Sequence, residues 1–181
     1  MKKVVLAVLM ASMLLAGCGT KTSGYKPESA VKTMEAVWEA HAEDEKFAIC
    51  GGSGENAVSD APGVVDVTDV ETMDSTLGIC EEAAGLLDDG ATIVHMMNAN
   101  TFTAGLYHLT DAKEAENFVA LTQDTIENKQ WICGFPEQLV IANVGSDYVF
   151  VAYGGTDQVE TFKTYLVEVT EAEVVVEQSL M

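Results

Sequence analysis

The sequence contains no arginine. All nine basic residues are lysines, set against 29 acidic residues, so the formal net charge is −20. Nucleic-acid binding needs a basic surface that releases counterions from phosphates, and this chain cannot assemble one. Arginine is also the usual residue for bidentate capture of carboxylates and phosphates. We therefore expect no nucleic-acid partner, while cationic ligands and divalent metals remain compatible with the acidic surface.

Cysteine is scarce and widely spaced. Apart from Cys18, the chain has Cys50, Cys80 and Cys133, separated by 30 and 53 residues, and no CxxC pair. A local pair of that kind fixes two zinc or redox ligands at once. Because three is an odd number, at most one disulfide can form within the chain, and at least one thiol is left over.

A long apolar run is missing as well. The uncharged segment from Val4 to Ala16 has 13 residues, which would span about 20 Å as a helix. A membrane-spanning helix needs roughly 20 residues. Lys2 and Lys3 precede the segment and small residues end it, a pattern typical of a secretory signal.

The end of this segment is more specific. Leu15-Ala16-Gly17-Cys18 resembles the lipobox of bacterial lipoproteins, in which the cysteine receives a diacylglycerol thioether and the preceding peptide bond is cut. The resemblance implies a signal peptide over 1–17 and a lipid anchor on Cys18 at the extracytoplasmic face of the cell membrane. Two acyl chains suffice for stable anchoring. The alternative is an ordinary secretory signal that happens to end in cysteine.

Three segments follow from this interpretation. Residues 1–17 are the signal peptide, residues 18–28 are the lipidated cysteine and a flexible tether, and residues 29–181 are a single domain. The tether is rich in Gly, Ser and polar residues, and ten such residues span roughly 16–19 Å. Removal of Lys2 and Lys3 would bring the net charge from −20 to about −22.

The first half of the domain predicts a helix and several short elements. Val31, Met34 and Trp38 recur at helical spacing after Ser29, a suitable N-cap. "FAICGG" predicts a short strand, 51–63 a loop, and "VVDV" a second strand. Residues 69–78 and 79–87 predict short helical pieces, the second ended by "DDG".

The second half predicts a clearer architecture. One or two strands cover 91–109, and Asp111 with Glu114 has the spacing of a capping box before a helix. "QLVIANV" and "DYVFVAYGG" then form a hairpin around Gly145-Ser146, and a helix begins at Thr156 or Asp157. The tail over 173–180 is ambiguous. This strand-helix-strand-strand-helix order predicts an α+β fold with a mainly antiparallel sheet and helices packed on one face.

Catalytic patterns are incomplete. Ser53 in "GGSGE" has a glycine two positions before it but Glu55 two positions after it, whereas a nucleophile elbow needs glycine at both. His95 or His108 would have to complete a triad in space. We expect Ser53 to lie in a flexible loop and neither histidine to be catalytic.

Metal-binding patterns are incomplete too. His41, His95 and His108 lack a local HxxxH partner, so structural roles are favoured. An acidic cluster lacks the order and the glycine of an EF-hand loop, and it comprises Asp60, Asp66, Asp69, Glu71 and Asp74. We expect no bound metal and no cofactor.

Two aromatic residues lie between the predicted helix and hairpin. Trp131 and Phe135, in "NKQWICGFPEQL", would anchor a partner if they were exposed. The alternative is that they plug the end of the core. Both interpretations stay open at the level of sequence.

The segment from about Ala91 to Tyr153, with "LYHL", "FPEQLVIANV" and "DYVFVAYG", resembles an uncharacterised lipoprotein family of Gram-positive, Firmicutes-type bacteria. The resemblance implies a lipobox signal before one small α+β domain of unknown function, and no active-site residue. The leading hypothesis is a membrane-anchored binding or interaction module, not an enzyme, with a protein or cell-envelope ligand as partner. The alternative is a cell-surface hydrolase or a divalent-metal-binding protein.

The anchor is directly testable. Replacing Cys18 with Ser removes the thiol that would carry the diacylglycerol, so palmitate labelling of the Cys18→Ser chain should be lost. Metabolic labelling followed by electrophoresis measures this. Labelling that persists in the variant would contradict lipidation at Cys18.

Overall fold

The structure is a computed structural model and describes residues 24–97, 101–132 and 134–181. Cys18 and Cys133 lie outside these residues. The elements, in chain order, are α1 (Ala30–Ala40), β1 (Ile49–Gly51), the 3-10 turn η1 (Gly54–Asn56), β2 (Val58–Ser59), β3 (Gly63–Val64), α2 (Val70–Ser75), α3 (Glu81–Ala84), β4 (Leu87–His95), β5 (Thr103–Leu109), η2 (Ala112–Glu114), α4 (Ala115–Asn128), β6 (Gln138–Val144), β7 (Tyr148–Gly154), α5 (Thr156–Thr170) and β8 (Glu173–Ser179).

The strands of the described residues form one antiparallel sheet in the order β2-β1-β4-β5-β7-β6-β8, with β3 paired to β4. The predicted α+β class and antiparallel sheet are therefore confirmed. The order of β5, α4, β6, β7 and α5 also agrees with the prediction. The ambiguous tail is β8, at one edge of the sheet, and the predicted loop over 51–63 contains η1 and the two-residue β2.

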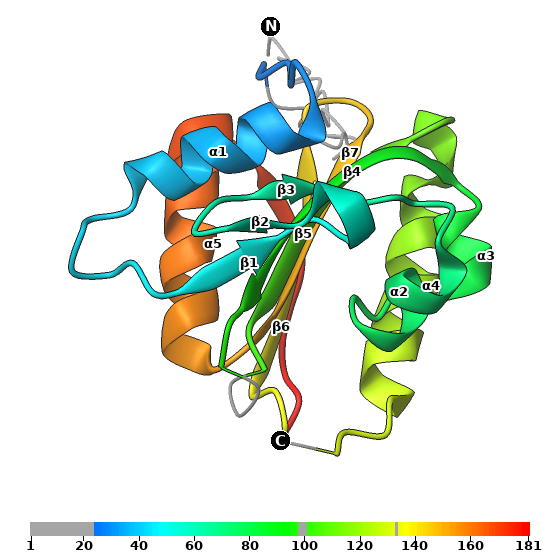
Figure 1. Cartoon of the computed structure of the whole chain (residues 1–181). Coiled ribbons are helices and arrows are strands. Elements are labelled where there is room, and N and C mark those ends of the chain that lie inside the picture. Colours follow the sequence, from blue (N-terminus) through cyan, green and yellow to red (C-terminus); the bar gives the residue numbers. More distant parts are fainter. Residues whose placement is uncertain (1–23, 98–100, 133) are drawn as a thin grey trace, which may run out of the picture.

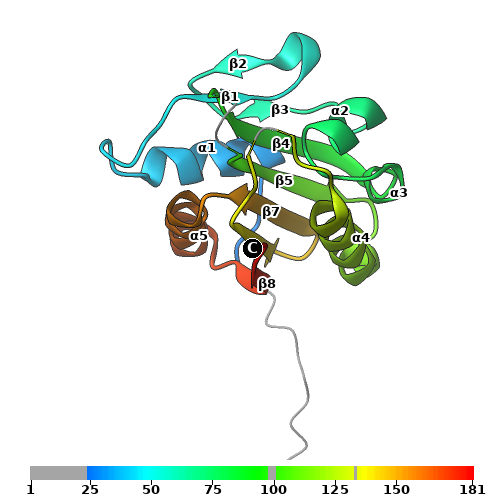
Figure 2. The ribbon, with the colours of Figure 1, turned by 90° about the horizontal axis from the view of Figure 1, so that it is seen from below.

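Helices cover both faces of the sheet, so the expectation that they pack on one face is wrong. Figures 1 and 2 show α1 and α5 on one side and α2, α3 and α4 on the other. Along β6, Val140 and Ala142 belong to the first core, whereas Leu139 and Ile141 belong to the second. A strand buried on both faces is apolar at consecutive positions and shows no alternation. "LVIA" and "VFVAY" have that character.

Aromatic side chains dominate the core beneath α1 and α5. The ring of Phe162 lies parallel to that of Phe150, with centroids 5.5 Å apart, and contacts Phe102 at 5.8 Å. The core beneath α2, α3 and α4 is built around the fully buried Phe118, Met73 and Tyr153. The first core joins α1 to α5, and the second joins α2 and α3 to α4, so each core connects helices that are distant in sequence.

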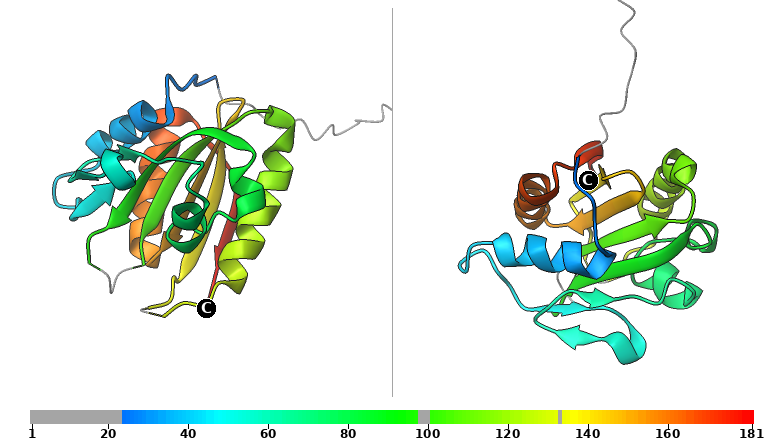
Figure 3. Two further views of the ribbon diagram at one scale, coloured as in Figure 1. Left: turned by 45° about the vertical axis from the view of Figure 1, so that its right-hand side comes forward. Right: turned by 90° about the horizontal axis from the view of Figure 1, so that it is seen from above.

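The two ends of the sheet differ. One end, called the tether end below, carries residues 24–29, the start of β4 and the β6–β7 turn (145–147) (Figure 3). The opposite end, called the distal end, carries the β4–β5 and α4–β6 connections and the C-terminal residue Met181 (Figure 1). Residue 24, the first described residue, therefore lies at the end of the sheet opposite these loops.

The described part of the predicted tether contacts the domain. Tyr25 packs against the first core. Gly145 has φ +64° in the β6–β7 turn, and a Cβ at this position would lie 2.9 Å from the Tyr25 carbonyl oxygen. A side chain would be strained there both by the backbone angle and by this approach. Residues 25–28 thus lie against the sheet rather than spanning freely.

Because each core has its own helices, truncation on either face should be destabilising. Phe118→Ala and Phe162→Ala should each lower the free energy of unfolding by about 3–5 kcal/mol, as expected for a buried phenylalanine. Val167→Ala, at a position on α5 that is 39% exposed, is the matched control and should change it by less than about 1 kcal/mol. Urea unfolding followed by circular dichroism measures all three. A small effect for either phenylalanine would contradict the two-faced packing.

Candidate functional site

Ser53 is not placed for catalysis. Its hydroxyl oxygen accepts a hydrogen bond from the backbone N–H of Asp66 at 3.2 Å, and its own N–H donates to the Val64 carbonyl at 3.3 Å. Neither His95 nor His108 is among its hydrogen-bond partners in the described chain. The serine fastens the loop before η1 to the segment after β3, so these residues do not assemble the triad that a hydrolase of this type requires.

His41 is a packing residue. It follows α1 and is almost fully buried, with its ring against those of Trp38, Phe162 and Tyr165. Its Nδ1 lies 2.8 Å from the Val37 carbonyl oxygen. Burial lowers the pKa of His41, although this hydrogen bond opposes the shift. The ring is therefore neutral at pH 7, with Nδ1–H as the donor to Val37.

His95 also serves local packing. It ends β4 and stacks on Phe47, with ring centroids 5.0 Å apart. Its Nδ1 accepts a hydrogen bond from the Met97 N–H at 3.0 Å, and partial burial lowers its pKa. The ring thereby orders the strand end at the distal end of the sheet.

Two residues of the acidic cluster, Asp66 and Asp69, bind N–H and hydroxyl groups of nearby threonines. Asp66 accepts from the N–H and the hydroxyl of Thr68, and Asp69 caps α2 by accepting from the N–H and hydroxyl of Thr72. Within the described residues, no group of three or more His, Cys, Asp or Glu side chains is arranged to hold a metal ion. Cys50 and Cys80 are free thiols.

His108 lies between two carboxylates at the tether end. Its Nδ1 is hydrogen-bonded to Asp88 of β4, and its Nε2 lies 3.2 Å from Asp147 Oδ2 in the β6–β7 turn. The β4–β5 register shifts between Leu87 and Asp89, which makes Asp88 the extra residue of a β-bulge. Bulges re-aim side chains, and this one directs Asp88 to the imidazole. We call His108, Asp88 and Asp147 the histidine bridge.

The protonation state of the histidine bridge follows from its geometry. An imidazole with a carboxylate at both nitrogens can donate to both only as the cation. Burial by itself would lower the pKa of His108, but the hydrogen bonds to Asp88 and Asp147 outweigh it and raise the pKa above 6.5. With neither nitrogen free, His108 is poorly suited to act as a general base.

Sequence reasoning missed both partners of this histidine. "LLDDG" was expected to end a helix, but α3 stops at Ala84 and β4 begins at Leu87. The sequence predicts Asp147 only as the first residue of the strand "DYVFVAYGG", after the Gly145-Ser146 turn. Two consecutive aspartates at the start of a strand were the available signal, because acidic residues are disfavoured in strands.

At the distal end, the two predicted anchor aromatics have different surroundings. Trp131 packs on Tyr153, with centroids 5.3 Å apart, beneath Lys129, so it closes the end of the second core. Phe135 is 69% exposed and Ile132 is 94% exposed. Met96 and Met97, in the β4–β5 connection at the same end (Figures 1 and 3), are 52% and 64% exposed. We call Met96, Met97, Ile132 and Phe135 the apolar rim.

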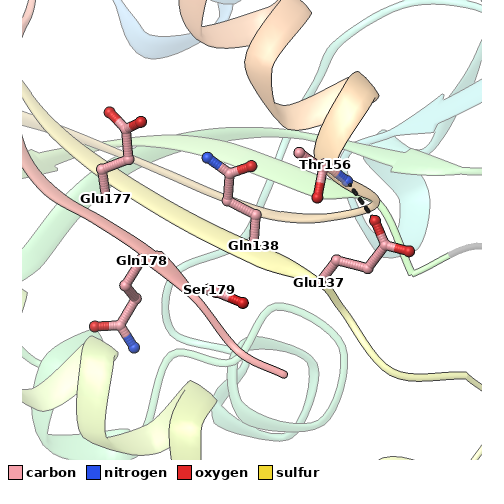
Figure 4. A pocket seen from close by; sticks show the side chains of 6 residues that line it. All are labelled: Glu137, Gln138, Thr156, Glu177, Gln178 and Ser179. Atoms are coloured by element: carbon pink, nitrogen blue, oxygen red, sulfur yellow. Dashed lines mark hydrogen bonds between the residues drawn. The ribbon is translucent and has the colours of Figure 1, made fainter.

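A polar cavity of about 310 Å³ lies at the same end. It is shown in Figure 4 and is lined by Glu137, Gln138, Thr156, Glu177, Gln178 and Ser179. Glu137 accepts from the Thr156 N–H at 2.9 Å, which fixes the start of α5 and lowers the pKa of the carboxyl. Glu177 is paired with Lys163 at 3.0 Å.

A second hollow of about 440 Å³ adjoins this cavity through Glu137 and Thr156 and also includes Asp157. Lys163 forms an ion pair with Glu177. Among the described residues, no lysine forms an ion pair with Glu137 or Asp157. The distal end thus combines exposed apolar side chains with two carboxylates, Glu137 and Asp157, that no lysine of the described residues pairs with.

Comparisons of this chain with protein-family models, with curated proteins and with solved structures find no match. In the part of the chain that the structure describes, no helix has the length and apolar character needed to cross a bilayer. Where the structure describes the chain, it brings together no nucleophile with a free base.

The three histidines should titrate in a defined order. His108 should protonate above pH 6.5, and His41 and His95 below it. Two carboxylates are hydrogen-bonded to His108, whereas burial is the largest influence on His41, where it outweighs Glu45, and on His95. NMR titration of the ring Hε1 signals measures this. Asp147→Asn should lower the His108 midpoint and leave the other two unchanged. A His108 midpoint below that of His95 would contradict the bridge.

Proposed function

We propose that this protein is a lipoprotein held at the extracytoplasmic face of the cell membrane by Cys18, and that its domain binds a partner protein through the distal end. It would belong with the lipoproteins of Gram-positive bacteria that its sequence resembles. The observation that carries the proposal is the apolar rim, which is exposed at the end opposite the segment that leads to the anchor.

The side chains of the rim suit a protein interface. The rim exposes large apolar side chains from two connections at one end of the sheet, and exposed apolar surface of this kind is typical of interaction sites. Aromatic residues and methionine are enriched at interfaces, and methionine adapts to varied surfaces. The rim lies at the end of the sheet opposite residue 24. In an anchored chain this position favours a partner that approaches from the side facing away from the membrane.

The negative charge of the distal end indicates what kind of partner surface would bind there. Glu137 and Asp157 lie at the same end, in a chain whose net charge is −20. A surface that carries lysine or arginine beside apolar residues would complement them. The same acidity disfavours contact of the rim with an anionic bilayer or with a second copy of the chain. A basic, partly apolar surface of another extracytoplasmic protein fits best.

A photo-crosslinking residue at Phe135, introduced into the complete chain in producing cells, tests the proposal. It should yield one discrete adduct that is absent when the same residue replaces Val58, an exposed position on β2. Mass spectrometry identifies the adduct. Equal adducts at both positions would contradict a specific distal site. Adducts of the chain with itself or with lipid would assign the rim to a dimer or to the membrane instead.

Direct binding then measures the contribution of the rim. With the identified partner purified, Phe135→Ser should weaken binding roughly 30-fold if Phe135 is a central anchor. Val58→Ser is the matched control and should leave the Kd within about twofold. The affinity should also fall as salt concentration rises. Unchanged affinity for Phe135→Ser would overturn the assignment of the rim as the binding site.

A further inference from the structure

The histidine bridge lies directly beneath the N-terminal segment. Viewed from the tether end, residues 24–29 cross over the ends of the central strands before α1 begins (Figure 3, right). A cavity of about 280 Å³ separates the two layers, and its lining comes from both: Tyr25, Lys26 and Pro27 from the segment, and His108, Ser146, Asp147 and Tyr148 from the sheet. His108 therefore lines the same cavity as the segment, so a change in its protonation would alter the surface on which the segment lies.

The same strands hold the segment by two further contacts. The Ala30 N–H, at the start of α1, donates to Asp89 Oδ2 at 2.9 Å. Asp89 pairs with His108 in the β4–β5 register and immediately follows Asp88. On the other side, Pro27 and the Tyr25 carbonyl approach Gly145, two positions before Asp147. Both supports of the segment are thus adjacent to the two carboxylates that His108 joins.

The groups around His108 come from four parts of the chain. From β4 come Asp88 and Asp89, from the turn Ser146 and Asp147, from β7 Tyr148, and from the segment Tyr25 and Lys26. The Tyr148 ring lies 4.7 Å from the imidazole, and its hydroxyl, with a pKa of about 12, stays neutral. Ser146 donates to Asp147 Oδ1 at 3.0 Å. Two carboxylates, Asp88 and Asp147, are thus hydrogen-bonded to the imidazole. Asp89 lies at the paired position on β4, and Lys26 is the cation that lines the same cavity.

From this geometry we infer that the histidine bridge is a pH-dependent latch for the N-terminal segment. The imidazolium joins β4 to the β6–β7 turn and holds the surface on which residues 25–29 rest. Neutral His108 can donate to only one carboxylate, which leaves the other facing a lone pair and the remaining negative charges. The turn and β4 then separate more readily, and the segment loosens.

The direction of the pH dependence follows from the raised pKa. Because the folded chain holds the proton more tightly, the contribution is fully present below about pH 6.5, the ordinary value, and is lost as pH rises through the raised value. His108 is about one-quarter exposed and Asp147 about one-third, so solvent screening moderates the effect.

The latch does not depend on the proposed partner or on the anchor. Where the chain is anchored through Cys18, release of residues 25–29 would lengthen the tether by up to about 17 Å, at roughly 3.4 Å per extended residue. An alkaline shift would then allow the domain to move further from the membrane, and an acidic shift would draw it back.

Hydrogen exchange of the complete chain in nonionic detergent tests the latch. The amides of Ala30, Lys32 and Thr33 donate hydrogen bonds at the start of α1. Their protection factors, each corrected for intrinsic exchange, should fall roughly 3- to 10-fold between pH 6 and pH 8.5. His108→Gln should abolish this dependence. His95→Gln, a histidine at the distal end, is the matched control and should preserve it.

Two outcomes would overturn the inference: protection that does not change with pH in the parent chain, or the same pH dependence in His108→Gln. If His108→Gln fails to fold by circular dichroism, Asp147→Asn replaces it. That variant should move the midpoint of the change to lower pH, because one of the hydrogen bonds that raise the His108 pKa is weakened. An unmoved midpoint would likewise overturn the latch.

Discussion

Burial of the central antiparallel strands on both faces is the constraint on which the rest of this structure depends. Nearly every position of β5, β7 and β6 is buried, so a single layer of helices would leave one face of these strands in water. The chain meets this requirement with α1 and α5 on one face and α2, α3 and α4 on the other. The charged side chains are thereby left outside the two cores, and no Asp, Glu or Lys of the described residues is buried.

The ends of the sheet are where chemistry remains available. At the tether end, strand starts and a tight turn bring acidic residues together around one imidazole, and the bulge at Asp88 completes that arrangement. At the distal end, the connections between strands and helices expose apolar side chains beside carboxylates. The histidine bridge at the tether end and the apolar rim at the distal end are separated by the length of the strands. This separation fits the proposed function, in which the domain is attached at one end and binds at the other.

The sequence predicted the elements well because their signals are local. Ser29 at the start of α1, the Asp111–Glu114 spacing before α4 and Gly145 in the β6–β7 turn each act within a few residues. The pattern of β5 residues predicts a strand, but one face of that strand packs against α4, for example Tyr107 against Phe118. No pattern within the strand itself could identify that helix. For the same reason Trp131 and Phe135 could not be separated: only the position of Tyr153 decides which of the two is covered.

By itself, the sequence determined the acidity of the chain, the absence of arginine and the type and order of the elements from β5 to α5, since each depends on composition or on neighbours along the chain. Its prediction of a lipid anchor at Cys18 rests on the same kind of short pattern. Only the tertiary structure decided that helices cover both faces, that His108 bridges Asp88 and Asp147, and that Phe135 is exposed where Trp131 is packed. These properties arise from contacts between residues 20 to 40 positions apart or more, and such contacts exist only after the strands have paired.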